Sequence, residues 1–386
     1  MINMEKWKKT CLGEIATEIS DRIDNPSKSG YERFVGLEHF VSGDLRIKKW
    51  GPTENLVSAM KLFKKGDILF ARRNAYLKRA SMVDFDGICS GDAFVIRENK
   101  DAIIPGFLAF IFNGEQLWQY ANSHAAGTMS KRVKWRDLAK YTLLVPPLKE
   151  QENIANLLWS INSTIEAYSK ISMHLGQLRQ SLEWEFFQKR KWKVGRIEEI
   201  AQVDYGISES VADNKDSKIG WPIITGANIS LEGDIDLSKK VYIEPPKKDQ
   251  FFLKEGDLLL NWRSGSPAHV GKTAIFDLDG KYTYASFILR IRSNSELFLP
   301  EYGFYLFNFL RRTEYFTKDV AQQVNFKMNA NVFRSVEVPV PELKEQNRIV
   351  KKLDRIVKQK KSIEAFIDRT TEIQKKIINQ IFVSKP

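Results

Sequence analysis

The chain repeats its own sequence once, and this repeat constrains its fold more than any other feature. The segment VPPLKEQENIANLL around Leu148 returns as VPELKEQNRIVKKL around Leu343, an offset of 195 residues. Three further matches keep the same order along the chain, and one chance resemblance could not produce all four. They pair Trp7 with Trp192, Gly66-Asp67 with Gly256-Asp257, and the turn at Asp84 with the turn at Asp277. The sequence therefore predicts two similar halves.

The first part of each half reads as a mixed α+β domain. Short apolar runs separated by Gly, Asp and Asn clusters indicate strands and turns. We expect strands within 66–72, 94–97 and 141–146, and their counterparts within 256–262 and 287–292. Apolar segments at 106–121 and 301–316 predict a helical patch in each copy. The predicted globular domains span residues 1–146 and 189–340.

The second part of each half reads as one long helix, over 147–188 and 341–386. Apolar residues recur every seven positions without an interrupting proline, a spacing typical of helices that pack lengthwise. Because each stripe is the other's natural partner, we expect the two helices to pair antiparallel as a coiled coil about 60 Å long that separates the globular domains. The predicted pairing residues are Ile154, Leu158, Ile161, Ile165, Leu175, Leu182, Ile349, Leu353, Ile356, Ile363 and Ile377.

Charge favours a polyanionic partner. Lys and Arg number 60 against 48 Asp and Glu, giving a formal net charge of +12. Such an excess serves nucleic-acid binding through phosphate neutralisation, although it also serves solubility. The two cysteines, Cys11 and Cys89, fit a reducing compartment. With no signal-peptide core and no membrane-length apolar run, the sequence predicts a cytoplasmic protein.

Motifs for catalysis are missing. The segment GSPAHVGKT, from Gly265 to Thr273, has one residue too many for a phosphate-binding loop and precedes a strand-like run. The four histidines are scattered without metal-ligand spacing. We therefore expect no enzyme activity, no catalytic residue and no metal site in this chain.

These features resemble the specificity subunit of type I restriction–modification systems. The resemblance is carried by the repeated GDIL/GDLL strand and by the VPPLKEQ and VPVPELKEQ junctions, each followed by a long helix, and it covers essentially the whole chain. It implies two target-recognition domains, each reading one half of a bipartite, asymmetric sequence in double-stranded DNA, with a spacer set by the helices. It also implies methyltransferase (modification) and motor–nuclease (restriction) subunits as partners. S-adenosylmethionine, ATP and Mg are then expected only in those partners.

Polar and basic loops after the shared strands are the predicted DNA contacts, because arginine can grip guanine and asparagine can grip adenine through two hydrogen bonds. In the first copy they are Arg72, Arg73, Asn74, Tyr76, Lys78, Arg79, Thr128, Ser130, Lys131, Arg132 and Lys134. In the second copy they are Asn261, Trp262, Arg263, Ser264, Ser266, His269, Lys272, Gln322, Gln323, Asn325, Lys327 and Asn329. Some of these, Lys78 above all, could instead touch only phosphate or solvent.

Other interpretations stay open at this point. A coiled-coil adaptor that never touches DNA would explain the helices but not the basic, amide-rich loops. An enzyme would need a catalytic motif in one copy. The specificity chain of a related restriction system with different partners would share most of the same features.

Overall fold

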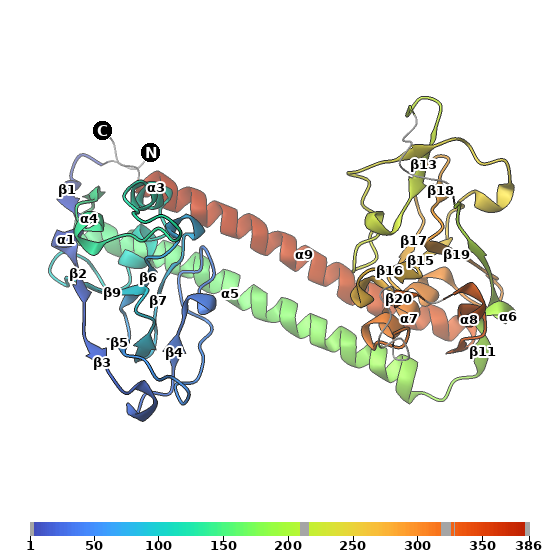
Figure 1. Ribbon diagram of the computed structural model, residues 1–386, viewed down its shortest axis with the longest axis horizontal. Coiled ribbons are helices and arrows are strands. Elements are labelled where there is room, and N and C mark those ends of the chain that lie inside the picture. The colour runs from blue at the N-terminus through green and yellow to red at the C-terminus, as the bar shows by residue number, and fades with distance from the viewer. Residues whose placement is uncertain (1–3, 209–215, 318–325, 328, 383–386) are drawn as a thin grey trace. The chain divides into compact units, whose positions relative to one another are not determined.

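The computed structural model describes residues 4–208, 216–317, 326–327 and 329–382 of the chain (Figure 1). It divides into two compact units. The first unit combines residues 1–171 with 363–386, and the second covers residues 172–362. Each unit therefore contains one globular domain together with parts of two long helices, α5 (Leu148–Trp184) and α9 (Leu343–Ile381).

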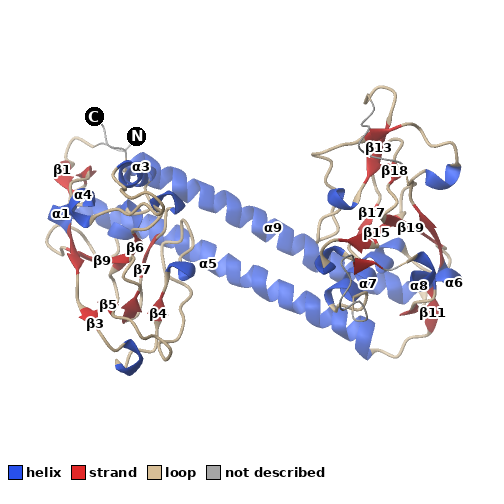
Figure 2. Ribbon diagram, viewed as in Figure 1, coloured by secondary structure: helices blue, strands red, loops and turns tan. Residues whose placement is uncertain are grey.

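The first globular domain is built on two four-stranded sheets (Figure 2). One sheet is antiparallel in the order β2 (Ala16–Ile19), β9 (Ala93–Glu98), β6 (Ile68–Ala71) and β7 (Ala80–Met82). The other has the order β3 (Arg22–Ile23), β5 (Met60–Phe63), β8 (Gly87–Cys89) and β4 (Phe34–Val35). A separate pair joins β1 (Lys8–Cys11) to β10 (Thr142–Val145), and the helices are α1 (Leu12–Ile15), α2 (Leu108–Ile111), α3 (Glu115–Ser123) and α4 (Trp135–Leu138).

The second globular domain repeats this plan. Its antiparallel sheet has the order β12 (Ala201–Tyr205), β19 (Ile288–Ser293), β15 (Leu258–Asn261) and β17 (Thr273–Ile275). A three-stranded sheet joins β14 (Tyr242–Ile243), β13 (Trp221–Ile224) and β18 (Thr283–Tyr284). Two pairs join β11 (Val194–Arg196) to β21 (Glu337–Pro339) and β16 (Arg263–Ser264) to β20 (Phe326–Lys327), and the helices are α6 (Ile197–Ile200), α7 (Pro300–Arg312) and α8 (Ala330–Arg334).

The repeated Gly-Asp pair makes the same turn in both domains. Gly66 and Gly256 both have positive φ, at 94° and 83°, a conformation that glycine adopts without strain. Asp67 accepts two hydrogen bonds of 2.7 Å from the Arg97 guanidinium and one from the backbone N–H of Lys64. Asp257 makes the same three bonds, to Arg292 and to Lys254. The predicted fold class, two similar α+β domains with a two-fold internal repeat and two long helices, is confirmed.

The repeated glutamine of the KEQ motif joins each long helix to its domain. Gln346 is fully buried; its Nε2 donates to the carbonyl oxygens of Leu297 and Pro341, and its Oε1 accepts from the backbone N–H of Leu299, each bond being 2.8 Å. In the first domain Gln151 bonds Ala102, Pro146 and Ile104 in the same way, at 2.9–3.0 Å. One amide therefore fixes the start of the helix against two backbone segments.

Within the first unit the two long helices lie antiparallel. Gln374 of α9 donates to the carbonyl oxygen of Leu158 in α5, and the rings of Tyr168 and Phe366 lie 4.6 Å apart between centroids. Later residues of α5 thus face earlier residues of α9.

Several of the predicted pairing residues lie in the domain cores. Leu158 belongs to the core of the first domain, with Ile154 and Ile377 packed against it. Ile349 and Leu353 belong to the core of the second domain, with Leu182 packed against it. Ile356 is buried, and Ile161, Ile165, Leu175 and Ile363 are half-buried.

The helical patches differ between the copies. In the second domain α7 runs unbroken from Pro300 to Arg312. In the first, α2 ends at Ile111 and α3 starts at Glu115. Gly114, the extended residue before α3, lies at the break. Glycine disfavours the helical conformation, so the helix does not continue through this position.

Replacing the buried glutamine should destabilise the protein strongly. We expect Gln346→Ala to lower the free energy of unfolding by about 2–4 kcal/mol, because it leaves buried backbone groups of Leu299 and Pro341 without partners. Urea unfolding measures the change. The control is Lys344→Ala, at an exposed neighbouring position. Equal free energies of unfolding in the two variants would contradict the stabilising role of Gln346.

Candidate nucleic-acid interface

The two predicted loops of the first domain meet each other. Arg73 and Arg132 pair as an antiparallel β-bridge. On either side, the N–H of Asn74 donates to the carbonyl of Lys131 at 3.0 Å, and the N–H of Val133 donates to that of Arg72 at 2.9 Å. The fold thus brings residues 72–79 and 128–134 together as one surface, although about fifty residues separate them in sequence.

Three arginines of this surface surround one carboxylate. Asp92 accepts a 3.0 Å hydrogen bond from Arg132 Nε, and its oxygens lie 3.8 Å from Arg72 Nε and 3.7 Å from Arg73 Nη1. Burial alone would raise the pKa of Asp92, but the Arg132 hydrogen bond and the three guanidinium charges hold it below its usual value. Three cations against one anion leave a local positive excess suited to phosphate or to a base edge.

The other predicted residues of the first domain have varied surroundings. Tyr76 is 65% exposed, and Thr128, Lys131 and Lys134 are also exposed. Ser130 accepts from Arg73 Nε at 2.5 Å. Lys78 is bound to both oxygens of Glu115, and Arg79 donates to the carbonyl of Leu37 at 3.0 Å. Lys78 and Arg79 therefore already have protein partners.

The second domain brings its predicted loops together at equivalent positions. Strand β16 pairs with β20 so that Arg263 faces Lys327, as Arg73 faces Arg132 in the first domain. The predicted residues Gln322, Gln323 and Asn325 lie outside the described residues, and only the backbone of Lys327 is described.

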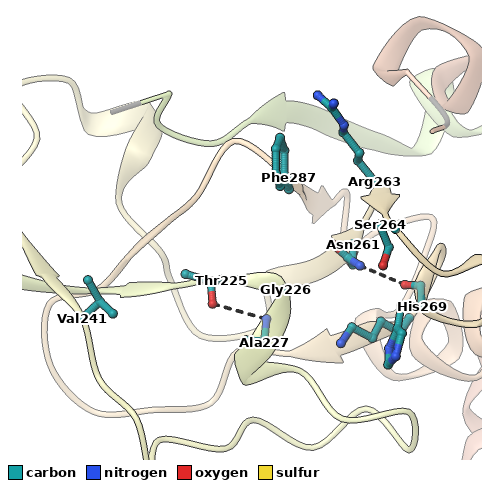
Figure 3. A pocket seen from close by; sticks show the side chains of 11 residues that line it. Thr225, Gly226, Ala227, Val241, Asn261, Arg263, Ser264, His269 and Phe287 are labelled. Atoms are coloured by element: carbon teal, nitrogen blue, oxygen red, sulfur yellow. Dashed lines mark hydrogen bonds between the residues drawn. The ribbon is translucent and has the colours of Figure 1, made fainter. Parts of the chain in front are cut away.

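Beside the paired strands β16 and β20 is a cavity of about 780 Å³ (Figure 3). Five of the predicted residues line it: Asn261, Arg263, Ser264, His269 and Lys272. Sequence reasoning missed Thr225, Gly226, Ala227, Val241 and Phe287, which also line it. No motif in the sequence marked these five residues. Arg263 lies over the half-exposed Phe287 ring at 4.9 Å, which places a cation and an aromatic face at the cavity.

Four predicted residues of the second domain hold its fold. Lys272 is 4% exposed, and its Nζ donates to the carbonyl of Ile229 at 2.6 Å. Asn261 Nδ2 donates to the carbonyl of His269, and Trp262 Nε1 to that of Ser286. Asn329 caps α8 by accepting from the N–H of Val332. Arg263, Ser264, Ser266 and His269 are only partly buried.

Burial also shifts the pKa values of two side chains at the cavity. It lowers the pKa values of His269 and Lys272, and the positive charge of Arg311 lowers both further. No Asp or Glu lines the cavity among the described residues. His269 is therefore held toward its neutral form, in which a ring nitrogen can accept a hydrogen bond.

The described part of the chain offers neither a metal-binding cluster nor a phosphate-binding loop. It contains no group of three or more His, Cys, Asp or Glu that could hold a metal ion. The segment after Gly265 forms a short 3₁₀ turn at Pro267–His269 and then strand β17, where a phosphate-binding loop would need a helix. Over those same residues, no helix is long and apolar enough to cross a membrane.

Comparison with known families decides the assignment. The family model for the type I restriction modification DNA specificity domain matches residues 4–175 and again residues 189–381. The chain belongs to this family. Its two matched segments coincide with the two copies of the repeat, and the specificity-subunit resemblance drawn from the KEQ junctions is confirmed. Specificity subunits are the non-catalytic chains of type I restriction enzymes, so the prediction that this chain is not an enzyme is also confirmed.

Similar specificity proteins cover from about three quarters to all of the chain. The type I restriction enzyme MjaX specificity subunit of Methanocaldococcus jannaschii is 24% identical over 99% of this chain and 96% of its own length. The EcoKI specificity subunit of Escherichia coli K12 is 24% identical over 72% of this chain and 64% of its own length. The solved S subunit from M. genitalium shares the fold, with a TM-score of 0.63 at 11% identity over 100% and 99% of the two chains.

The Asp92 cluster should make the first domain sensitive to acid. Because the folded-state pKa of Asp92 is depressed, its ion pairs stabilise the fold above the unfolded pKa of about 4, and that stability is lost as the pH falls through the folded value. Wild type should therefore exceed Asp92→Asn in free energy of unfolding at pH 7, with the difference shrinking below about pH 4. Urea titrations across that range measure it. A difference that does not change with pH would show that the charge of Asp92 has no part in it.

Proposed function

We propose that this chain is the DNA-reading subunit of a type I restriction–modification system. Each globular domain reads one half-site of a bipartite, asymmetric target in double-stranded DNA, and the long helices set the unread spacer. The chain works in the cytoplasm and directs methyltransferase and restriction subunits to that target. S-adenosylmethionine, ATP and Mg belong to those partner subunits.

The antiparallel pairing of the two predicted loops in each domain is the observation that carries this proposal. Arg73 and Arg132 in one domain, and Arg263 and Lys327 in the other, occupy equivalent bridge positions. A two-stranded ribbon of this kind fits the major groove, where arginine can bind guanine through two hydrogen bonds. The exposed Lys131 and Lys134 beside it suit phosphate contacts. An adaptor that never touched DNA would have no need for two basic residues at paired backbone positions in both domains.

The side chains around the two ribbons differ, which supports an asymmetric target. Arg72 of the first domain aligns with Trp262 of the second, and Tyr76 has no aromatic counterpart at Ser266. The second ribbon also lies beside the cavity with Phe287, a potential apolar contact for a base edge. Unlike readers predict unlike half-sites.

The helices are long enough to hold half-sites one turn of DNA apart. Helices α5 and α9 contain 37 and 39 residues, or about 55–60 Å each at a rise of about 1.5 Å per residue. Half-sites one helical turn apart are separated by about 34–36 Å.

The helices also expose large apolar side chains that partner subunits could cover: Leu157, Ile171, Met173, Leu178, Phe366 and Ile373.

Single-molecule sequencing of DNA methylation tests the proposal directly. Cells that express this chain with its modification partner should carry one methylated motif, composed of two unlike halves around a gap of fixed length. Deleting this chain while keeping the partner should abolish the motif. A methylation pattern that persists without the chain, or the absence of any motif despite a stable complex, would contradict the proposal.

A further inference from the structure

A buried carboxylate lies between two arginines in the second unit. Glu183, near the end of α5, is 1% exposed. Its Oε1 accepts from Arg179 Nε at 2.8 Å, one turn earlier in the same helix, and its Oε2 accepts from Arg312 Nη2 at 2.6 Å. Arg312 is the last residue of α7, so this ion pair joins the end of the long helix to the globular domain.

The polar network continues to the other long helix. The Arg179 guanidinium lies 5.6 Å from the centre of the Tyr305 ring, and the Tyr305 hydroxyl donates to Asp354 of α9 at 2.5 Å. Burial lowers the pKa of Arg312 against the opposing effect of Glu183, yet a guanidinium remains protonated at any ordinary pH. Directional charged contacts therefore hold the end of α5 on this domain.

The first unit docks the end of α9 in the same way, but apolar side chains stand at the positions of Glu183 and Arg312, and the polar contacts there are the neutral ones of Gln374 and Asn379. Phe187 contacts Tyr302 at 5.6 Å in the second unit, and Phe382 contacts Phe107 at 5.6 Å in the first, each pair edge to face. These residues correspond at the offset of 195. At that offset Glu183 aligns with Ile378.

Three further members of the network are apolar in the first copy, whereas Arg179 aligns with the polar, uncharged Gln374. Arg312 aligns with Leu117, and both Leu117 and Ile378 are buried in the core of the first domain. Tyr305 and Asp354 align with Phe110 and Trp159, whose rings pack at 5.0 Å. The copies therefore share one docking geometry and differ in its polarity.

This difference concerns specificity more than stability. A buried ion pair generally contributes no more stability than a well-packed apolar pair, whereas a buried charge without its partner costs several kcal/mol. Two similar helix ends and two similar docking sites create a risk of wrong pairing, within a chain or with a second copy. Placing Glu183 in the Leu117 site would bury its carboxylate with Arg179 as its one remaining partner, and placing Ile378 opposite Arg312 would leave that guanidinium without its carboxylate.

We propose that the Glu183–Arg312 pair is a sorting contact that directs the end of α5 to the second domain and the end of α9 to the first. The charged site rejects the apolar helix end, and the apolar site rejects the charged one. The contact thereby opposes dimers in which the end of α5 of one copy docks on the first domain of another, or the end of α9 docks on the second. This inference does not depend on DNA recognition.

The test transplants the first-unit residues into the second. The full-length variant Arg179→Gln/Glu183→Ile/Arg312→Leu should fold cooperatively, because the first unit already accommodates Gln374, Ile378 and Leu117. Without the sorting contact its dimer association constant should rise by about tenfold or more relative to wild type, tenfold being the equivalent of about 1.4 kcal/mol. Size-exclusion chromatography with light scattering over a concentration series measures it.

Two further variants make the result specific. Adding Leu117→Arg and Ile378→Glu to the triple variant moves the charged pair to the first unit and should return the association constant toward the wild-type value. Glu183→Gln keeps the shape and removes the charge, so it tests the proposal even if the triple variant fails to fold, and it should raise dimerisation by a smaller factor.

The control breaks an exposed ion pair of the same unit. Lys361 lies 2.8 Å from Asp234, with both side chains about 60% exposed, and Lys361→Ala should leave the association constant unchanged. The proposal would be overturned if the folded triple variant and Glu183→Gln both had the same dimer association constant as wild type. Failure of the relocated pair to reverse an increase would also overturn it.

Discussion

The structure depends on one buried amide in each half of the chain. Gln151 and Gln346 sit at the first turn of a long helix, and each bonds the proline before that helix and a loop from the middle of its domain. A buried amide is costly unless its donors and acceptor are paired, so these bonds admit only one direction for the helix. The short KEQ motif therefore does structural work at the junction, which explains why it recurs when the reading loops do not.

The arginine surface of the first domain is assembled by the sheets that carry its loops. In the first domain, Arg72 and Arg73 follow β6 and Arg132 lies near α4, yet all three converge on Asp92. Three guanidiniums repel one another, and the single carboxylate holds them without neutralising them. The resulting site keeps a local positive excess, which suits the proposed contact with DNA.

Sequence reasoning reached the elements that local pattern specifies. The strands at 68–71, 93–98, 142–145, 258–261 and 288–293 and both long helices fall where periodicity and turn residues indicate. The break at Gly114 was missed, since the apolar pattern alone continues through it. Loop pairing such as Arg73 with Arg132 was out of reach, because it arises from contacts distant in sequence.

Burial of polar residues was equally hidden in the sequence. Lys272 and Asn261 read as exposed contacts, but the fold places each one beside a backbone carbonyl, where its hydrogen bonds are satisfied internally. The same residue types serve both purposes, so composition cannot separate them. Which of the predicted residues touch DNA stays a prediction, with the partly exposed arginines and lysines the strongest candidates.

If each domain reads its own half-site independently, damage to one reader should leave the other half of the target intact. Methylation sequencing with Arg73→Ala/Arg132→Ala, assembled with the modification partner, measures this. We expect base discrimination to relax in one half of the motif, while the other half and the spacer length are unchanged. Equal degradation of both halves, or an unaltered motif in an active complex, would contradict it.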